Sequence, residues 1–336
     1  SPISSSTASR PASNAFDFGS LVIRTHAMDT AAIEAAVSNA HSAAMAKSGG
    51  RNADYIPFLA SVPQNLCAVA VASVDGQIFA AGDSTYDFAI QSISKVFTLA
   101  LVTDLIGPHR VRAKVGANPT GLPYNSVIAL ELNDGKPMSP LVNAGAIATV
   151  SLVPAQTAEQ RWAKILACQS AFAGRSLALC EELNQSEQST NFHNRAITWL
   201  LYSSGVLDND PMDALDVYTR QCSTMISTVD LAKMGATLAA GGINPFTGER
   251  AVSRENVPHV LAQMMMEGFY IASGDFAYTV GLPGKSGVGG GVLAIAPGKL
   301  AIAGFSPPLN AAGNSVRGLT AVCEVAHALN LNLFAA

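Results

Sequence analysis

The chain has 336 residues, of which 49% are hydrophobic and 13% are charged, and its formal net charge is -4. This length can bury one large core or two smaller ones. The low charged fraction argues against a disordered or nucleic-acid-coating protein, and the small negative charge offers no attraction to nucleic acid or an anionic membrane. No apolar run is long enough to span a bilayer.

The cysteines and histidines predict neither disulfides nor a metal site. The five cysteines are odd in number and widely spaced, and each has apolar neighbours. They favour buried free thiols in a reducing compartment, so we expect a cytoplasmic protein. The six histidines show no HxH or HExxH spacing, so no metal and no other cofactor is expected.

The chain begins with a segment that we expect to be a flexible tail, residues 1–20. Its first sixteen residues are rich in Ser, Pro and Ala and cannot bury enough apolar surface to order themselves. The segment lacks the apolar core of a secretory signal, and whether it is a processed terminus stays open. A helix is predicted over residues 29–47, capped by Asp29 or Thr30.

Strands are predicted near both ends of the chain and helices in its centre. Two hairpins are expected, one joining residues 66–73 to 77–81 and one joining 292–296 to 300–305, because Asp75-Gly76 and Pro297-Gly298 are turn sequences. The apolar periodicity predicts helices over residues 93–105, 158–171, 194–204, 229–240 and 319–329.

This order of elements indicates an α+β fold, an antiparallel sheet flanked by helices with an inserted, mainly helical lobe. We expect the sheet part to span about residues 21–94 and 275–336, and the lobe about residues 95–274. A site is expected in the cleft between the two parts.

Ser92 and Lys95 are the first candidate catalytic pair. They lie three residues apart at the start of a predicted helix, so they share one face and can touch. A serine hydroxyl becomes a good nucleophile when a neighbouring base takes its proton, and burial with a helix N-terminus favours the neutral amine that a lysine base needs. An isolated S-x-x-K pattern is more often a helix cap followed by a solvated lysine.

A second element, Lys285-Ser286-Gly287, strengthens the interpretation. Serine hydrolases that use S-x-x-K also carry a K-[S/T]-G strand, whose lysine brings positive charge to the nucleophile. The N–H groups of Val288 and Ser92 are then expected to bind the oxyanion. A second K-S-G, which begins at Lys47, ends a predicted helix and is expected to have no catalytic role.

These residues resemble the serine-dependent glutaminases, which are similar in fold to the serine β-lactamases. The resemblance runs from about residue 26 to 334. Its segments are Ala53-Asp54-Tyr55-Ile56-Pro57, Gln91-Ser92-Ile93-Ser94-Lys95, Pro140-Leu141-Val142-Asn143-Ala144-Gly145-Ala146, Ser186-Glu187 with Asn194, Tyr218-Thr219-Arg220-Gln221-Cys222-Ser223, Gly268-Phe269-Tyr270, Leu282-Pro283-Gly284-Lys285-Ser286-Gly287-Val288, and Ser306-Pro307-Pro308-Leu309.

The resemblance implies hydrolysis of free L-glutamine to L-glutamate and ammonia by a homodimer or homotetramer. It implies Ser92 as nucleophile and Lys95 as general base, with Tyr270 and Tyr55 assisting proton transfer. The implied substrate-binding residues are Ser92, Asn143, Glu187, Asn194, Tyr218, Tyr270 and Val288, and the implied supporting residues are Lys285, Ser286 and Gly287. A single carboxylate, Glu187, suits the substrate ammonium, and the asparagine amides suit its carboxylate.

Two positions depart from the family pattern. His193 replaces the arginine of an Asp-Arg-Asn sequence, and Asn310 replaces an aspartate after Ser-Pro-Pro-Leu. Two alternative functions stay open: a penicillin-recognising enzyme, disfavoured because S-D-N is absent, and a glutamine sensor without turnover, disfavoured because Ser92 and both lysines are present.

Overall fold

The computed structural model describes residues 29–335, so the predicted tail at residues 1–20 lies outside the described part of the chain. Its centre is a five-stranded antiparallel sheet in the order β2-β1-β7-β6-β5, accompanied by a two-stranded sheet of β3 and β4. The strands are β1 Ala68–Ser73, β2 Ile78–Gly82, β3 Phe88–Ala89, β4 Met225–Ile226, β5 Gly284–Ser286, β6 Gly291–Ala296 and β7 Leu300–Phe305.

Helices fill most of the chain between β3 and β5. The α-helices are α1 Thr30–Met45, α2 Pro57–Ala60, α3 Ser94–Ile106, α4 Pro108–Val115, α5 Ile128–Glu131, α6 Asn143–Ser151, α7 Ala158–Ala173, α8 Glu181–Thr190, α9 Phe192–Ser203, α10 Pro211–Cys222, α11 Thr228–Ala239, α12 Val257–Glu267, α13 Ser273–Thr279 and α14 Val316–Ala328. Two short 3-10 helices are η1 Gln91–Ile93 and η2 Tyr270–Ala272.

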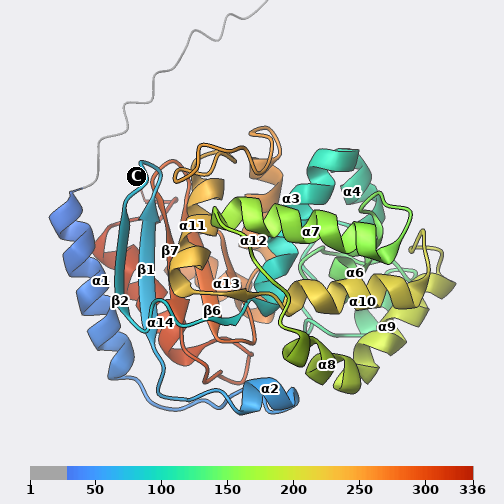
Figure 1. Ribbon diagram of the computed structural model, residues 1–336, viewed down its shortest axis with the longest axis horizontal. Helices are drawn as coiled ribbons and strands as arrows, with labels where there is room; N and C mark the ends of the chain where they lie inside the picture. The colour runs from blue at the N-terminus through green and yellow to red at the C-terminus, as the bar shows by residue number, and fades with distance from the viewer. Residues whose placement is uncertain (1–28, 336) are drawn as a thin grey trace, which may run out of the picture.

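Helices cover both faces of the larger sheet (Figure 1). Alternate residues of β1 point to opposite faces, as a strand requires. Val69 and Val71 join the core under α1 and α14, whereas Ala68 and Ala70 join the core shared with α11. Burial on both faces explains why β1 reads as an unbroken apolar run.

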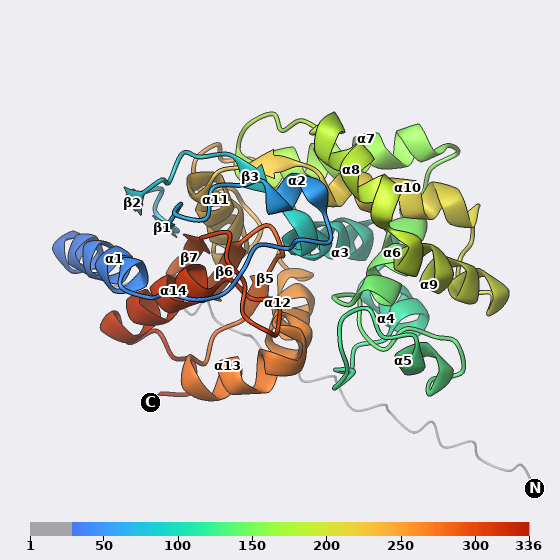
Figure 2. The ribbon, with the colours of Figure 1, turned by 90° about the horizontal axis from the view of Figure 1, so that it is seen from below.

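The helices from α4 to α10 form a region beside the sheet. In Figure 1, α4 and α6 to α10 lie at the right, and Figure 2 shows α5 and α9 at the end away from α1. The predicted antiparallel sheet flanked by helices is confirmed, as are both hairpins. Helix α11 lies within the range assigned to the lobe but packs on the sheet, and the division into sheet part and lobe stays a prediction.

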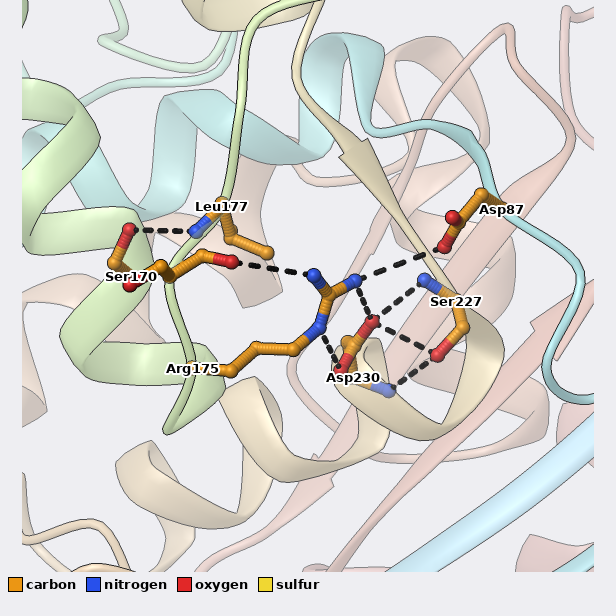
Figure 3. Close-up of polar contacts among 7 residues, drawn as sticks. Asp87, Ser170, Arg175, Leu177, Ser227 and Asp230 are labelled. Carbon is orange, nitrogen blue, oxygen red and sulfur yellow. Dashed lines mark hydrogen bonds and ion pairs between the residues drawn. The ribbon is translucent and has the colours of Figure 1, made fainter.

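A polar network joins the helical region to the strand that leads to η1 (Figure 3). Arg175, just after α7, donates from Nε to Oδ1 of Asp230 at 2.9 Å and from a terminal nitrogen to Oδ2 at 2.6 Å. The same guanidinium lies 3.6 Å from Asp87, the residue before β3. Asp230 also closes a capping box with Ser227 that starts α11.

Among residues 29–335, no helix combines the length and apolar character needed to cross a membrane.

Candidate active site

Ser92 and Lys95 are in direct contact, as their spacing predicts. Ser92 lies in η1 rather than in the helix itself, and Lys95 is the second residue of α3. The amine of Lys95 lies 2.7 Å from the Ser92 hydroxyl oxygen. Only 1% of Lys95 is exposed, and this burial lowers its pKa to about 8, against the opposing influence of Cys222 and Glu187.

Asn143 extends this contact into a buried hydrogen-bond network. Its Oδ1 accepts from the amine of Lys95 and from the hydroxyl of Tyr218, each at 3.1 Å. Its Nδ2 donates to Oδ1 of Asn194 at 2.9 Å. The network therefore joins α3, α6, α9 and α10, and two donors fix the orientation of the Asn143 amide.

Gln91 connects the Ser92 turn to Glu187. Its backbone is left-handed, with φ of 48°, which is uncommon for a residue with a side chain and is typical of functional sites. Its Nε2 donates to Oε2 of Glu187 at 3.0 Å. Burial raises the pKa of Glu187 to about 7, although the Gln91 hydrogen bond and the charge of Lys95 act to lower it.

The K-S-G strand β5 brings Lys285 into the same region. Its amine lies 4.1 Å from the centroid of the Tyr270 ring and donates to the Ser286 carbonyl at 2.8 Å. Burial lowers the pKa of Lys285 well below its usual range, and the charge of Lys95 adds to this effect. The hydroxyl of Ser286 is buried and has no hydrogen-bond partner within the described chain.

Gly287 allows this strand to approach the Ser92 turn. A Cβ at this position would lie 2.9 Å from the carbonyl oxygen of Ile90, tighter than ordinary packing permits. The adjacent Val288 is buried, and among residues 29–335 nothing accepts a hydrogen bond from its N–H. A backbone donor without a partner is suited to a charge that develops on a substrate oxygen.

Tyr270 and Tyr55 lie at different depths. Tyr270 is buried, adopts a φ of 57° and packs against Tyr124, with ring centroids 4.9 Å apart and the rings tilted by 39°. Burial raises the pKa of Tyr270, whereas hydrogen bonding to Ser92 acts to lower it. Tyr55 is 52% exposed, and its hydroxyl lies 3.3 Å from that of Tyr124.

These tyrosines border the mouth of the site. A cavity of about 640 Å³ is lined by Tyr55, Tyr124, Tyr270 and Val288, together with residues around Asn310. It is large enough to admit an amino acid. The other K-S-G lies elsewhere: Lys47 is exposed just after α1, and its carbonyl accepts from Arg317 at 3.0 Å.

The two departures from the family pattern make local contacts. A ring nitrogen of His193 lies 2.6 Å from the carbonyl oxygen of Asn125, in the loop that precedes α5. Asn310 accepts from the N–H groups of Ala312 and Asn314, so it closes a turn at the cavity rim.

Three residues of this region were not assigned a role from the sequence: Gln91, Tyr124 and Glu267. Gln91 could have been found, because it immediately precedes the nucleophile candidate. Glu267 offers a weaker signal, a lone acid after the apolar sequence Met264-Met265-Met266. Tyr124 carries no sequence signal, since its position depends on a loop. Within the described range, no group of three or more His, Cys, Asp or Glu residues is arranged to hold a metal ion.

Comparison with known proteins assigns a family to this arrangement. The glutaminase family matches residues 50–334. Proteins named glutaminase from Brucella canis and Mycobacterium ulcerans are 65% and 62% identical to this chain, over 90% and 91% of it and 96% of each of them.

Solved structures agree with this match. The protein named "Probable glutaminase ybaS" is 60% identical with a TM-score of 0.91, covering 92% of this chain and all of the other. A probable glutaminase from Bacillus subtilis is 30% identical with a TM-score of 0.81, covering 90% of this chain and 96% of the other. The protein Mglu, solved in a glutamate form, is 34% identical with a TM-score of 0.84, and the match covers 90% of this chain and 69% of Mglu. With its fold, its sequence and its buried serine and lysine in agreement, the chain belongs to the glutaminase family of amidohydrolases.

Proposed function

We propose that this chain hydrolyses free L-glutamine to L-glutamate and ammonia through an ester formed on Ser92, with Lys95 as the general base. The observation that carries the proposal is the 2.7 Å contact between the Lys95 amine and the Ser92 hydroxyl, both buried. Because the pKa of Lys95 is lowered to about 8, a useful fraction of the amine is neutral near physiological pH.

The reaction then has two halves. The Ser92 oxygen attacks the side-chain amide carbon while Lys95 takes the hydroxyl proton, and the N–H groups of Val288 and Ser92 bind the oxyanion. The carbon–nitrogen bond breaks as Tyr270 or Lys95 delivers a proton, and ammonia leaves. Water next attacks the γ-glutamyl ester, gives up a proton to the same base, and releases glutamate and the Ser92 hydroxyl.

The same proposal assigns the substrate-binding residues. Glu187 binds the α-ammonium, whereas Asn143, Asn194 and Tyr218 bind the remaining polar groups of glutamine. These side chains support the assignment because they meet around Ser92 and Lys95 through hydrogen bonds of about 3 Å. Mglu, a structural relative, was solved in a glutamate form, and glutamate is the product proposed for this chain.

The outer residues have supporting roles in this proposal. Lys285 supplies positive charge beside Tyr270, and Gly287 allows the Val288 N–H to reach the oxyanion. Ser286, whose hydroxyl has no hydrogen-bond partner among residues 29–335, offers it to substrate or to the attacking water. Tyr55 closes over the substrate from the cavity mouth and assists proton transfer from there.

The organisation of the molecule is part of the proposal. Residues 21–336 form the glutaminase domain, with a sheet part of about residues 21–94 and 275–336 and a helical lobe of about residues 95–274. The domain assembles as a homodimer or homotetramer, which sedimentation velocity of the purified chain measures directly.

Ser92→Ala tests the nucleophile in an assay of ammonia release from glutamine. We expect this variant to lose nearly all turnover and to keep its fold, because a buried serine differs from alanine by one hydroxyl. A matched control is Ser38→Ala on the exposed side of α1, which should behave like the parent. Ser92→Ala activity above about one percent of the parent would exclude the ester mechanism, since loss of a nucleophile costs several orders of magnitude.

The ammonia assay and a cephalosporin assay together test the two alternative functions. A glutamine sensor without turnover releases no ammonia. A penicillin-recognising enzyme hydrolyses a chromogenic cephalosporin, which we expect this chain to leave intact because its sequence lacks S-D-N.

A further inference from the structure

Glu267 is a buried carboxylate that the mechanism above does not use. It is the last residue of α12, and only 1% of it is exposed. Its Oε2 accepts from the N–H of Thr120 at 2.6 Å, and its Oε1 lies 3.3 Å from the Thr120 hydroxyl. Both carboxylate oxygens therefore hold one residue of the loop between α4 and α5.

The end of α12, which carries Glu267, packs against β5, which carries Lys285. The backbone of Gly268 is so close to β5 that a Cβ there would lie 1.7 Å from the carbonyl oxygen of Gly284. The N–H of Ser286 donates to the Gly268 carbonyl at 3.3 Å. Residues 267 and 285 are thus held on adjoining backbones.

The charges of these two residues act on each other. Burial lowers the pKa of Lys285 and raises that of Glu267, and the charge of each opposes the effect of burial on the other. Among the described residues, the buried centre of the molecule contains two lysines, Lys95 and Lys285. Glu187 acts electrostatically on the first and Glu267 on the second.

Tyr270 contacts Lys285 and also Tyr124, which lies in the same loop as Thr120. The Lys285 amine is 4.1 Å from the centroid of the Tyr270 ring, and the centroid of the Tyr124 ring is 4.9 Å from it. Tyr124 follows Thr120 by four residues, and its carbonyl accepts from the N–H of Asn143 at 2.9 Å. Glu267 therefore has a connection to two neighbours of Tyr270, Lys285 and the loop that carries Tyr124.

We propose that Glu267 is a positioning residue for Tyr270. Its carboxylate serves as the counter-ion of Lys285 and, through Thr120, anchors the loop that carries Tyr124 against Tyr270. This inference rests on the proposed function, in which Tyr270 assists proton transfer, and it adds a reason why a buried acid lies three residues before that tyrosine.

Glu267→Gln tests the counter-ion. The variant keeps an amide that can still bond Thr120, but it removes the charge beside Lys285, near which Lys95, Tyr270 and Cys222 are the other titratable groups. Lys285 then loses its proton more easily, so the high-pH limb of the kcat profile should move down by about one pH unit. We expect kcat to fall about tenfold and KM to change little.

Thr120→Val tests the anchor without changing any charge. It removes the hydroxyl that contacts Glu267 and also bonds the Leu122 backbone at 3.2 Å, which loosens the loop at the edge of the substrate cavity. KM should rise by roughly threefold to tenfold with an unchanged pH profile, and Thr120→Ser should restore the parent KM.

The two variants separate positioning from a structural role. A parent-like kcat and pH profile in Glu267→Gln, or the same profile shift in Thr120→Val, would overturn the proposal. If Glu267→Gln fails to fold in a thermal melt, the Thr120 pair decides, since an unchanged KM in Thr120→Val removes the anchoring role. Ser92→Ala in the same assay tests the serine mechanism separately. Retained turnover in Ser92→Ala contradicts that mechanism, whereas the kcat, KM and pH profiles of the Glu267 and Thr120 variants test only the positioning role.

Discussion

Gln91 donates a hydrogen bond to Glu187 at 3.0 Å, and Gln91 is also the residue immediately before Ser92. The proposed nucleophile and the proposed ammonium-binding carboxylate are therefore joined through one side chain whose backbone is held at a φ of 48°. This connection limits how far Ser92 and Glu187 can move apart, and the proposed substrate has to span the distance between them. It predicts an enzyme that selects both for a free ammonium and for the length of the side chain.

Glu187→Gln should reduce turnover of glutamine. The variant loses the charge-assisted hydrogen bond to the substrate ammonium, which contributes roughly 1.5–3 kcal/mol, so kcat/KM should fall about tenfold to a hundredfold. The parent should reject N-acetylglutamine, because a buried carboxylate left unpaired is costly, and should use asparagine poorly because its carbonyl stops one methylene short of Ser92. Measured kcat/KM for the three compounds checks this, and a parent that accepts N-acetylglutamine as well as glutamine contradicts the role of Glu187.

Activity should rise with pH between about 7 and 8. Glu187, with its pKa raised to about 7, must be ionised to bind the ammonium, and Lys95, with its pKa lowered to about 8, must be neutral to accept the Ser92 proton. Both requirements are met by losing a proton, so kcat/KM should increase through this range, until loss of the Lys285 proton lowers activity again at higher pH. The negative charge of Glu187 raises the pKa of Lys95, so its removal in Glu187→Gln should lower that pKa. The rise of kcat/KM with pH should therefore move to lower pH in this variant. A profile that is flat or falling from pH 6 to 8 contradicts Lys95 as the base.

The two K-S-G sequences provide a matched pair of lysine variants. Lys285→Ala should lower kcat by about a hundredfold to a thousandfold, since it removes positive charge from a buried site. Lys47→Ala should leave activity unchanged, because Lys47 is exposed beyond the end of α1. Thermal melts and the volume-conserving Lys285→Met separate loss of charge from a packing defect. Similar activity in Lys285→Ala and Lys47→Ala would refute the choice between the two sequences.

Local features of the fold could be predicted from the sequence because neighbouring residues determine them. The second hairpin was predicted at residues 292–296 and 300–305, and β6 and β7 span Gly291–Ala296 and Leu300–Phe305. The cap of α1 at Asp29 is confirmed, since its side chain accepts from the N–H of Ala31. The contact between Ser92 and Lys95 can be predicted for the same reason, since residues three positions apart on a helix share a face.

Contacts between distant segments could not be predicted in this way. Thr120 and Glu267 are separated by 147 residues, and no local sequence pattern indicates which loop will donate hydrogen bonds to a buried glutamate. Asn143, Glu187 and Asn194 were assigned through the resemblance to glutaminases, because an isolated asparagine or glutamate carries no physical sign of a ligand. The placement of α11 on the sheet likewise depends on tertiary packing, since its apolar face would suit either part of the molecule.

Asp230 lies at the junction shown in Figure 3 and should have a large effect on stability without taking part in catalysis. It is buried, and it accepts from Arg175 and from both the N–H and the hydroxyl of Ser227. Burial acts to raise its pKa, but these hydrogen bonds outweigh burial and leave the pKa below its usual value. An exposed ion pair of comparable length, Lys114 with Asp208 at 3.1 Å, provides a control.

Asp230→Asn should lower the free energy of unfolding by about 2–3 kcal/mol at pH 7. This value is at or below the low end of the cost of breaking a fully buried ion pair, because Arg175 is 43% exposed and solvent screens its charge. Asp208→Asn should cost no more than about 0.5 kcal/mol.

Because the pKa of Asp230 is lower in the folded chain than in the unfolded chain, its carboxylate stabilises the fold above about pH 4. This contribution is lost as the pH falls through the pKa of the folded state. Urea unfolding at pH 7 and pH 3 measures both effects. The difference between the parent and Asp230→Asn should shrink at pH 3, and a difference that is equal at the two pH values, or no greater than that of Asp208→Asn, would show that this network does not stabilise the junction.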